Sequence, residues 1–365
     1  MKIMTEIKVK DIYSVIDQFA PFVFQEEWDN SGLQIGSLSA SVERVMLTLD
    51  VTKEAVAQAT KWDTNLIISH HPLIFRPLRC IDFSNEVIYQ LIKSNINVIS
   101  AHTSLDVVYG GVSYQLATDL EIENLEILSP KKESKYYKVS FFLPRGYEKS
   151  IVENIFDSGV GEYNFYKDCA FESFGEGRYK EKEGANPFIK APSVFKEAKM
   201  EVIVREEKLF SLLKNLKNIH PYQEVAFDVF KESINPVNIG YGCVGNLPKS
   251  RKLSQLINHC KEKLGIGSVR YVGDLNKKVK KVALCGGSGG SFVSDAVKAE
   301  ADVYITGDLK YHEVLENKDK IALIDIGHRA SELPVLKKIE KILKSNFSAL
   351  KLYHFVENKD FFSSY

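Results

Sequence analysis

The sequence lacks an excess of charge of either sign, because 48 lysines and arginines balance 48 aspartates and glutamates. Proteins that bind phosphate backbones usually carry a basic surplus, so this balance argues against nucleic acid as the main partner. No apolar run approaches the roughly 18 residues that a membrane-spanning helix needs. Residues 1–6 also lack the apolar core of a signal peptide. We therefore expect a cytoplasmic protein without a membrane partner.

Cysteine is sparse and poorly placed for a disulfide framework. The five cysteines are odd in number, and no two follow the Cys-x-x-Cys spacing of zinc knuckles and redox motifs. We therefore expect free thiols in a reducing compartment. The composition is otherwise that of a soluble globular protein, with 44% hydrophobic and 26% charged residues. A length of 365 residues predicts two or three domains, since single cores rarely grow beyond about 300 residues.

Short apolar runs alternate with helical patterns, which indicates β-α-β units and a parallel sheet. One unit lies at 45–69, and a second lies at 281–308, where a glycine-rich turn joins the first strand to the helix. An offset of 237 aligns the two units without a gap and places Val45 on Val282. Residue identity between them is low, but the shared pattern predicts a duplicated α/β lobe.

The strand that follows each unit ends before the same His-x-x-x-acid pattern. His102 and Asp106 form the first pair, and His328 and Glu332 form the second, at an offset of 226. In a parallel α/β sheet, ligands bind outside the carboxyl ends of the strands. The repeated pattern therefore predicts a binding site built by both lobes.

The region between the lobes has a different pattern. Residues 129–245 follow the order β-α-β-β-α-β, which suggests a ferredoxin-like domain. Such an insertion is tolerated where its two ends lie close together. We therefore expect an α/β protein whose lobes, at 1–128 and 246–365, are duplicates with parallel-type sheets, interrupted by an α+β insert.

His70 and His71 end an apolar strand and are the first candidates for metal ligands. Successive side chains of a strand point to opposite faces, so the two imidazoles can diverge, each toward its own ion. Imidazole and carboxylate donors suit first-row divalent metals. A histidine and an acid four residues later share one face of a helix, so the acid could bridge two ions about 3.5–4 Å apart. A lone His-x-x-x-acid pattern is common and usually structural; its repetition favours a metal site.

Other segments keep two interpretations. The glycine turn at 286–291 could hold a phosphate with its amides, or it could be a tight turn that permits close packing. Asp308 and His312 are either groups around the metal site or residues that begin a helix. Trp28 and Tyr304 are expected to be packing residues rather than parts of a cofactor site.

Five segments occur in an order that resembles a known family: Trp28–Leu33, Ser69–Phe75, Ala101–Asp106, Ile305–His312 and Gly327–Glu332. Together they resemble the Nif-three-like dinuclear metal-centre family, whose members are often named GTP cyclohydrolase I type 2 homolog. The resemblance covers both lobes. Ser104 stands where the family more often has asparagine, and Arg329 stands where an aromatic residue is frequent. Arg329 could attract a phosphate or a carboxylate, or point to solvent.

The resemblance implies two divalent metal ions per subunit, zinc, iron or manganese, held by His70, His71, Asp106, His328 and Glu332. Glu332 would bridge the ions, and His102 would be a nearby base or an extra ligand. The resemblance also implies a toroidal homohexamer. The insert is similar to the CutA-like module of the longer bacterial members.

Two functions remain open at this point. The first is a metal-dependent hydrolase acting on a small molecule, with a nucleotide or phosphoester as the favoured substrate. The second is a non-catalytic metal-binding or regulatory scaffold that binds a protein partner. Binding of nucleic acid is a weaker third interpretation, because the formal net charge is zero.

Overall fold

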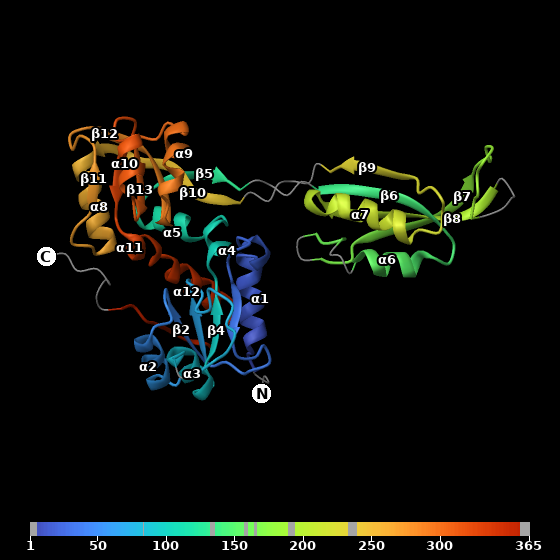
Figure 1. The fold of residues 1–365 in the computed structure, drawn as a ribbon. Coiled ribbons are helices and arrows are strands. Elements are labelled where there is room, and N and C mark those ends of the chain that lie inside the picture. Colours follow the sequence, from blue (N-terminus) through green and yellow to red (C-terminus); the bar gives the residue numbers. More distant parts are fainter. Residues whose placement is uncertain are drawn as a thin grey trace. The chain divides into compact units, whose positions relative to one another are not determined.

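The computed structural model describes residues 6–82, 84–131, 136–156, 160–163, 166–188, 194–232 and 239–357. The chain forms two compact units, one made of Met1–Lys131 with Asn238–Tyr365 and one made of Lys132–Val237 (Figure 1). Within the described ranges, no helix combines the length and the apolarity that a membrane crossing requires.

The first unit contains the elements at the two ends of the chain. Its N-terminal part holds α1 (Val9–Phe19), η1 (Phe22–Phe24), β1 (Gly32–Ile35), β2 (Arg44–Thr48), α2 (Lys53–Lys61), β3 (Leu66–Ser69), α3 (Glu86–Lys93), β4 (Asn97–Ser100), α4 (Thr103–Asp106), α5 (Val112–Asp119) and β5 (Glu123–Pro130). Its C-terminal part holds β10 (Gly240–Lys252), α8 (Leu253–Leu264), β11 (Arg270–Val272), β12 (Lys278–Ser288), η2 (Gly290–Phe292), α9 (Val293–Lys298), β13 (Val303–Gly307), α10 (Tyr311–Asn317), β14 (Ala322–Asp325), α11 (His328–Glu332), α12 (Val335–Asn346) and β15 (Lys351–His354).

The first sheet has the strand order β1-β4-β3-β2-β15. Strands β4, β3, β2 and β15 are parallel, and β1 pairs with β4 in the antiparallel direction. One face packs against α2 and α3, and the other packs against α1 and α12. Every residue of β3 and β4 is buried. Burial on both faces explains why these strands are nearly continuous apolar runs in the sequence.

The second sheet has the order β11-β14-β13-β12-β10-β5. Only its three central strands, β12, β13 and β14, are parallel, while β11, β10 and β5 pair in the antiparallel direction. Helices α5 and α8 cover one face, and α9 and α10 cover the other. The structure confirms a mixed α/β protein, but the expected parallel character is limited in this sheet to its centre.

The two sheets share the register of their central strands. Val45 of β2 pairs with Leu66 of β3, and Val282 of β12 pairs with Val303 of β13. Both members of the second pair are 237 positions beyond those of the first. Equal register at a constant offset is what a duplicated unit would have, and it supports the interpretation of the lobes as copies.

The offset between equivalent residues of the two lobes changes at the third strand and again at the helix that follows it. Leu66 pairs with Asn97, and Val303 pairs with Ala322, so β14 lies 225 positions beyond β4. The helices that follow, α4 and α11, align at 226. The second copy therefore has one extra residue before its helix. Gly327 occupies the N-cap of α11 with φ of 83°, a conformation that glycine adopts without steric cost.

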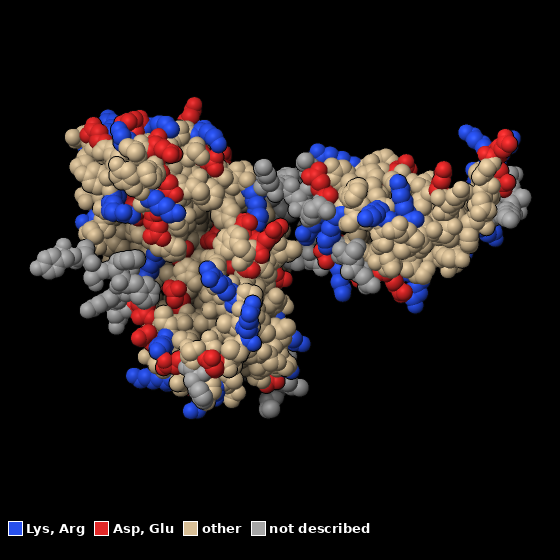
Figure 2. Space-filling view, in the orientation of Figure 1, with Lys and Arg blue, Asp and Glu red and all other residues tan. Residues whose placement is uncertain are grey.

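Terminal elements cross between the lobes of this unit. The C-terminal strand β15 pairs with β2 of the first sheet, and α12 buries Leu336 and Leu343 in the core of that sheet. In return, β5 pairs with β10 at the edge of the second sheet. On the face of the first unit that Figure 2 shows, basic and acidic side chains are intermixed.

The second unit holds β6 (Tyr136–Pro144), α6 (Glu148–Phe156), β7 (Ala170–Arg178), β8 (Val194–Arg205), α7 (Glu206–Ile219) and β9 (Phe227–Lys231). Its sheet has the order β7-β8-β6-β9, and all neighbouring strands are antiparallel. Ile151 and Ile155 of α6 and Leu216 of α7 pack with Phe141 in its core. The element order is that of a ferredoxin-like module. The domain limits expected at 129 and 245 stay a prediction.

Candidate metal centre

The residues singled out in the sequence gather at the carboxyl ends of parallel strands in both lobes. His70 and His71 directly follow β3. His102 is the N-cap of α4 after strand β4, and Asp106 ends that helix. His328 and Glu332 begin and end α11, which follows β14. This edge is where α/β sheets place their ligands.

His70 is fully buried, and its ring orientation leaves one nitrogen free. Its Nδ1 lies 2.8 Å from the carbonyl oxygen of Ala101, which can only accept, so Nδ1 carries the proton. Nε2 therefore presents a lone pair. It lies 3.6 Å from Asp106 Oδ1 and 3.7 Å from Glu332 Oε1, and it has no hydrogen-bond partner within the described part of the chain. A buried nitrogen left in this way, facing two carboxylates, fits a metal ligand.

His71 is held by a carboxylate that the sequence interpretation missed. Its Nδ1 lies 2.8 Å from Asp50 Oδ1, and its Nε2 lies 3.0 Å from Glu332 Oε2. Thr48 pairs with Ser69 in the parallel register of β2 and β3, and continuing this register by two residues brings Asp50 beside His71. The signal was therefore present: an acid two residues beyond the end of the neighbouring strand.

His328 repeats the arrangement in the second lobe. Its Nδ1 lies 2.7 Å from Asp308 Oδ2, and its Nε2 lies 3.0 Å from Glu332 Oε1. Asp308 therefore lies beside the proposed metal site. This agrees with the first of the two interpretations of Asp308 from the sequence. His312 is exposed on α10, where its ring contacts that of Tyr311.

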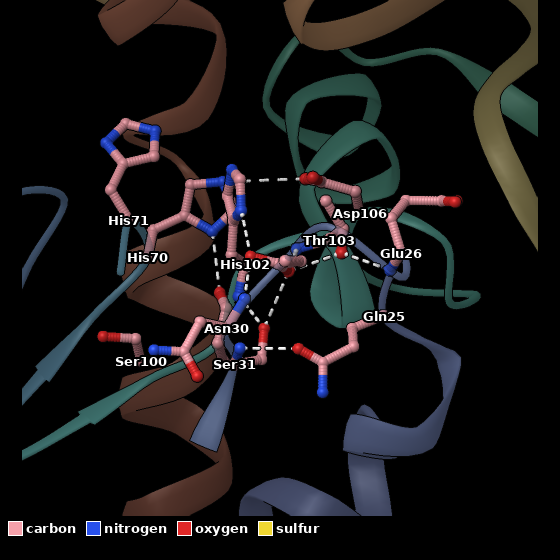
Figure 3. A network of polar contacts seen from close by, with 12 residues as sticks. Gln25, Glu26, Asn30, Ser31, His70, His71, Ser100, His102, Thr103 and Asp106 are labelled. Carbon is pink, nitrogen blue, oxygen red and sulfur yellow. Dashed lines mark hydrogen bonds and ion pairs between the residues drawn. The ribbon is translucent and has the colours of Figure 1, made fainter. Parts of the chain in front are cut away.

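His102 completes the set of histidines whose Nδ1 bonds to an acceptor. Its Nδ1 lies 2.9 Å from Asp29 Oδ1, and the backbone N–H of Thr103 donates to Asp29 Oδ2 over 3.0 Å. The backbone N–H of His102 donates to Ser31 Oγ over 3.1 Å (Figure 3). Burial alone would raise the pKa of Asp29, but the hydrogen bonds from His102 and Thr103 hold it well below its usual range. Asp29 is therefore an ionised anchor for the imidazole.

Glu332 lies at the centre of the site and is buried. Burial alone would raise its pKa, but the hydrogen bonds from His328 and His71 and the nearby imidazole of His70 hold it well below its usual range. The carboxylate acts in return on the imidazoles. The pKa of His71 rises to about 10, because the bonds to Asp50 and Glu332 outweigh burial. The bond to Glu332 raises the pKa of His328 to about 9.

The donor set fits divalent metal. Ligand atoms about 2.05 Å from a tetrahedral ion lie roughly 3.3 Å apart. The distances from Glu332 to the three histidine Nε2 atoms run from 3.0 to 3.7 Å. Among the residues that the structure describes, two groups of donors lie close enough to hold an ion, and His71 is common to both: His70, His71 and His102, and His71, His328 and Glu332. Carboxylates or carbonyls that orient each Nδ1 are what metal-binding histidines usually have.

The contacts of the glycine turn favour packing over phosphate binding. Three of its amides already donate to side-chain hydroxyls: Gly286 to Ser113 Oγ at 3.2 Å, Gly287 to Ser331 Oγ at 2.8 Å and Gly289 to Thr306 Oγ1 at 3.0 Å. A Cβ added at Gly287 would lie 2.5 Å from Glu332 Oε1. Of its two interpretations, close packing is therefore the one that the structure supports, and the packing partner is the central carboxylate.

Three further expectations have mixed outcomes. Tyr304 is a packing residue as expected, since it is fully buried and its hydroxyl donates to the carbonyl of Gly289 over 2.7 Å. The guanidinium of Arg329 donates to the carbonyl of Glu357, so it is held by the chain itself. The expectation for Trp28 was wrong, because 58% of this residue is exposed.

Known proteins similar to this chain carry related names. The curated GTP cyclohydrolase 1 type 2 homolog of Staphylococcus epidermidis is 35% identical over 344 residues, 93% of each chain. The Bacillus subtilis protein of the same name is 35% identical over 332 residues, 89% of each chain. A solved structure titled as a Bacillus cereus protein related to NIF3 has a TM-score of 0.68 and 32% identity, covering 99% of this chain and 100% of that one.

A more distant structure, reduced HcgD from Methanocaldococcus jannaschii, shares the fold with a TM-score of 0.57 and 20% identity, covering 96% of this chain and 98% of that one. A family comparison matches residues 7–360 to Duf34/NIF3 (NGG1p interacting factor 3). The match spans both lobes and the insert between them, and the chain belongs to the Duf34/NIF3 family.

Proposed function

We propose that this protein is a metal-dependent hydrolase with a dinuclear centre held by His70, His71, Asp106, His328 and Glu332. One observation carries the proposal. Glu332 is a buried, ionised carboxylate that faces the Nε2 atoms of three histidines, each of which is fixed through Nδ1. A carboxylate in that position is suited to bridging two ions.

The centre is proposed to take two ions of zinc, iron or manganese, because imidazole and carboxylate donors accept all three. Two such ions would supply a nucleophile at neutral pH and polarise the electrophile of the substrate. The two lobes contribute unequal shares of the donors. His70, His71 and Asp106 come from the first, and His328 and Glu332 come from the second.

His102 is proposed to transfer a proton rather than to hold an ion. Asp29 accepts its Nδ1 proton, which fixes the tautomer and leaves Nε2 free to accept or return a proton. The ring lies within contact of both strand-end histidines, with centroids 5.3 Å from His70 and 5.6 Å from His71. A fixed base beside a dinuclear centre suits hydrolysis, in which the leaving group needs a proton.

The substrate is proposed to be a small nucleotide or another phosphoester. The name of the curated relatives, GTP cyclohydrolase 1 type 2 homolog, supports a nucleotide. Arg329 and the glycine turn give no further support, because both are engaged within the chain. The cytoplasmic location, the homohexamer and the CutA-like nature of the insert remain parts of this proposal.

The test combines metal analysis with turnover. Protein purified without chelator is expected to contain close to two equivalents of a first-row metal, and to hydrolyse at least one compound of a nucleotide and phosphoester panel. Glu332→Gln keeps the size of the side chain and is expected to lose metal and turnover together. Glu262→Gln, an exposed position on α8, is the matched control and should change neither. Stoichiometric metal with no turnover across the panel would favour the scaffold instead.

A further inference from the structure

Trp28 and Phe75 form an exposed aromatic pair beside the metal centre. Their ring centroids lie 5.8 Å apart at an interplanar angle of 51°. Trp28 is 58% exposed and Phe75 is 49% exposed. Single exposed aromatic residues are ordinary on protein surfaces and need no explanation. A pair of them next to a polar and buried site is a candidate surface for ligand contact.

Hydrogen bonds fix the two loops that carry these rings. The side-chain amide of Asn30, two residues after Trp28, donates to the carbonyl of Ile74 over 2.6 Å. The N–H of Ile74 donates to Gln34 Oε1 over 3.1 Å, and Gln34 Nε2 donates to the carbonyl of Asn30 over 2.6 Å. Residues on both loops are thus tied together next to the rings. These hydrogen bonds therefore preorganise the aromatic pair, and the exposure of its rings does not result from loosely held loops.

The loop of Trp28 is also tied to the catalytic side. Asp29, the next residue, accepts the Nδ1 proton of His102 and the N–H of Thr103. The indole lies edge-on to the imidazole of His102, with ring centroids 6.0 Å apart. His102 in turn contacts His70, which is fully buried. A series of ring contacts therefore runs from the exposed Phe75 through Trp28 and His102 to His70, a proposed metal ligand.

The second tryptophan, Trp62, has a structural role and differs from Trp28 in its contacts. Trp62 follows α2 and stacks on Tyr353 of β15, with ring centroids 5.0 Å apart and an interplanar angle of 29°. It is only partly exposed. Trp28 has no stacked partner of this kind among the described residues; its neighbours Phe75 and His102 are tilted or edge-on. A face of the indole is therefore free to stack.

We propose that Trp28, supported by Phe75, is the platform on which a planar heteroaromatic ring of the substrate, a nucleobase, stacks. This inference rests on the proposed function and names the part of the substrate that binds outside the metal centre. Stacking on an aromatic side chain tolerates different bases, since each has a π face. Arg76 and Arg79 follow Phe75, are exposed and form no ion pair within the described part of the chain, so they are available to phosphate groups.

The fluorescence of Trp28 itself provides the test, because the chain has two tryptophans. In a Trp62→Phe variant of the full-length, metal-loaded protein, Trp28 is the single indole and reports directly on stacking. Guanosine, adenosine and uridine triphosphates are expected to quench it in a saturable manner. Tripolyphosphate, which has the anion but no ring, should not. Failure of all three nucleotides to quench at millimolar concentration would overturn the platform.

Binding of the same probes to substituted proteins gives the second measurement. Trp28→Ala should weaken nucleotide binding on the order of 10- to 100-fold, and Trp28→Phe should weaken it less, because stacking is worth about 1–3 kcal/mol per base. Phe210→Ala removes an even more exposed aromatic side chain, at 79%, from the insert and should have no effect. Equal affinities for Trp28→Ala and the control would refute the inference.

The two proposals fail separately. Stacking without hydrolysis supports the platform and refutes the hydrolase. Hydrolysis that survives Trp28→Ala with unchanged KM refutes the platform and leaves the hydrolase standing. If Trp28 fluorescence shifts with protein concentration and not with nucleotide, the ring belongs to a contact between copies of this chain, and the platform is refuted.

Discussion

The Gly287→Ala substitution should weaken metal binding at the proposed centre while the surrounding fold is retained. Gly287 has φ of 67°, and the added Cβ would lie 2.5 Å from Glu332 Oε1, whereas contacts of a Cβ below 3.0 Å are essentially never observed. The carboxylate therefore has to retreat. The nearest relief, from 2.5 to 3.0 Å, moves the oxygen by about 0.5 Å, well above the roughly 0.2 Å that ligand distances tolerate.

Two losses are expected, of different origin. The left-handed backbone conformation costs an alanine about 1–2 kcal/mol of folding free energy. Displacement of Glu332 disturbs a carboxylate that faces three histidines, and metal affinity should fall by at least the roughly 10- to 100-fold seen when groups around metal ligands are lost. Unfolding followed in the presence of chelator measures the first loss. Competition with a chromophoric chelator measures the second.

Gly265→Ala is a control that shares only the first loss. Gly265 caps α8 in the left-handed region with φ of 66°, and no atom lies within 4 Å of where its Cβ would be. Without metal, Gly287→Ala should therefore lose at least as much stability as Gly265→Ala, while only Gly287→Ala loses metal affinity. If the two variants retain equal metal affinity, Glu332 is not a ligand or the turn does not position it, and the reasoning behind the centre is wrong.

Three other outcomes are expected. Asp50→Asn should lower metal affinity roughly 10- to 100-fold, because it weakens the bond that orients His71; unchanged affinity in the chelator assay would count against this role. Metal affinity should rise with pH up to about 9–10. The pKa values of His71, about 10, and His328, about 9, lie above 7, so metal must displace a proton from each imidazole. Calorimetry in buffers of different ionisation enthalpy counts the protons released. Burial lowers the pKa of His220 in the insert, and its Nδ1 accepts a hydrogen bond from the N–H of Tyr222. The contribution of His220 to the stability of the insert should therefore be complete above about pH 6.5. It should decline below that pH, because the unfolded chain binds the proton more readily than the folded chain. Hydrogen exchange in peptides of the insert at pH 7.5 and 5.5 tests this, and His220→Gln should flatten the difference.

Patterns within single segments predicted most of the fold. The strands β3 and β4 are buried along their whole length and are mostly apolar, and the constant offset between the lobes anticipated equal strand register. The insert likewise follows the order of elements expected from its alternating patterns. These features depend on local periodicity, which a sequence displays directly.

What the sequence concealed depends on residues that meet only in the folded chain. The roles of Asp50 and Asp29 follow from strand register and from a loop that returns to α4, and neither has a pattern of its own. The hydroxyls that occupy the amides of the glycine turn come from three separate elements. Trp28 was misjudged because an aromatic residue in a polar turn does not reveal whether it is covered.

The exchange of terminal elements between the lobes has a consequence for synthesis of the chain. The core and the edge of the first sheet depend on α12 and β15, which are translated after every other element of that sheet. Glu332 is translated 262 residues after His70, a delay of about 13–52 s at 5–20 residues per second. During that interval the nascent first lobe has an open strand edge and an uncovered apolar face, while the insert can already fold. Its dependence on chaperones should therefore be concentrated before α12 and β15 are made.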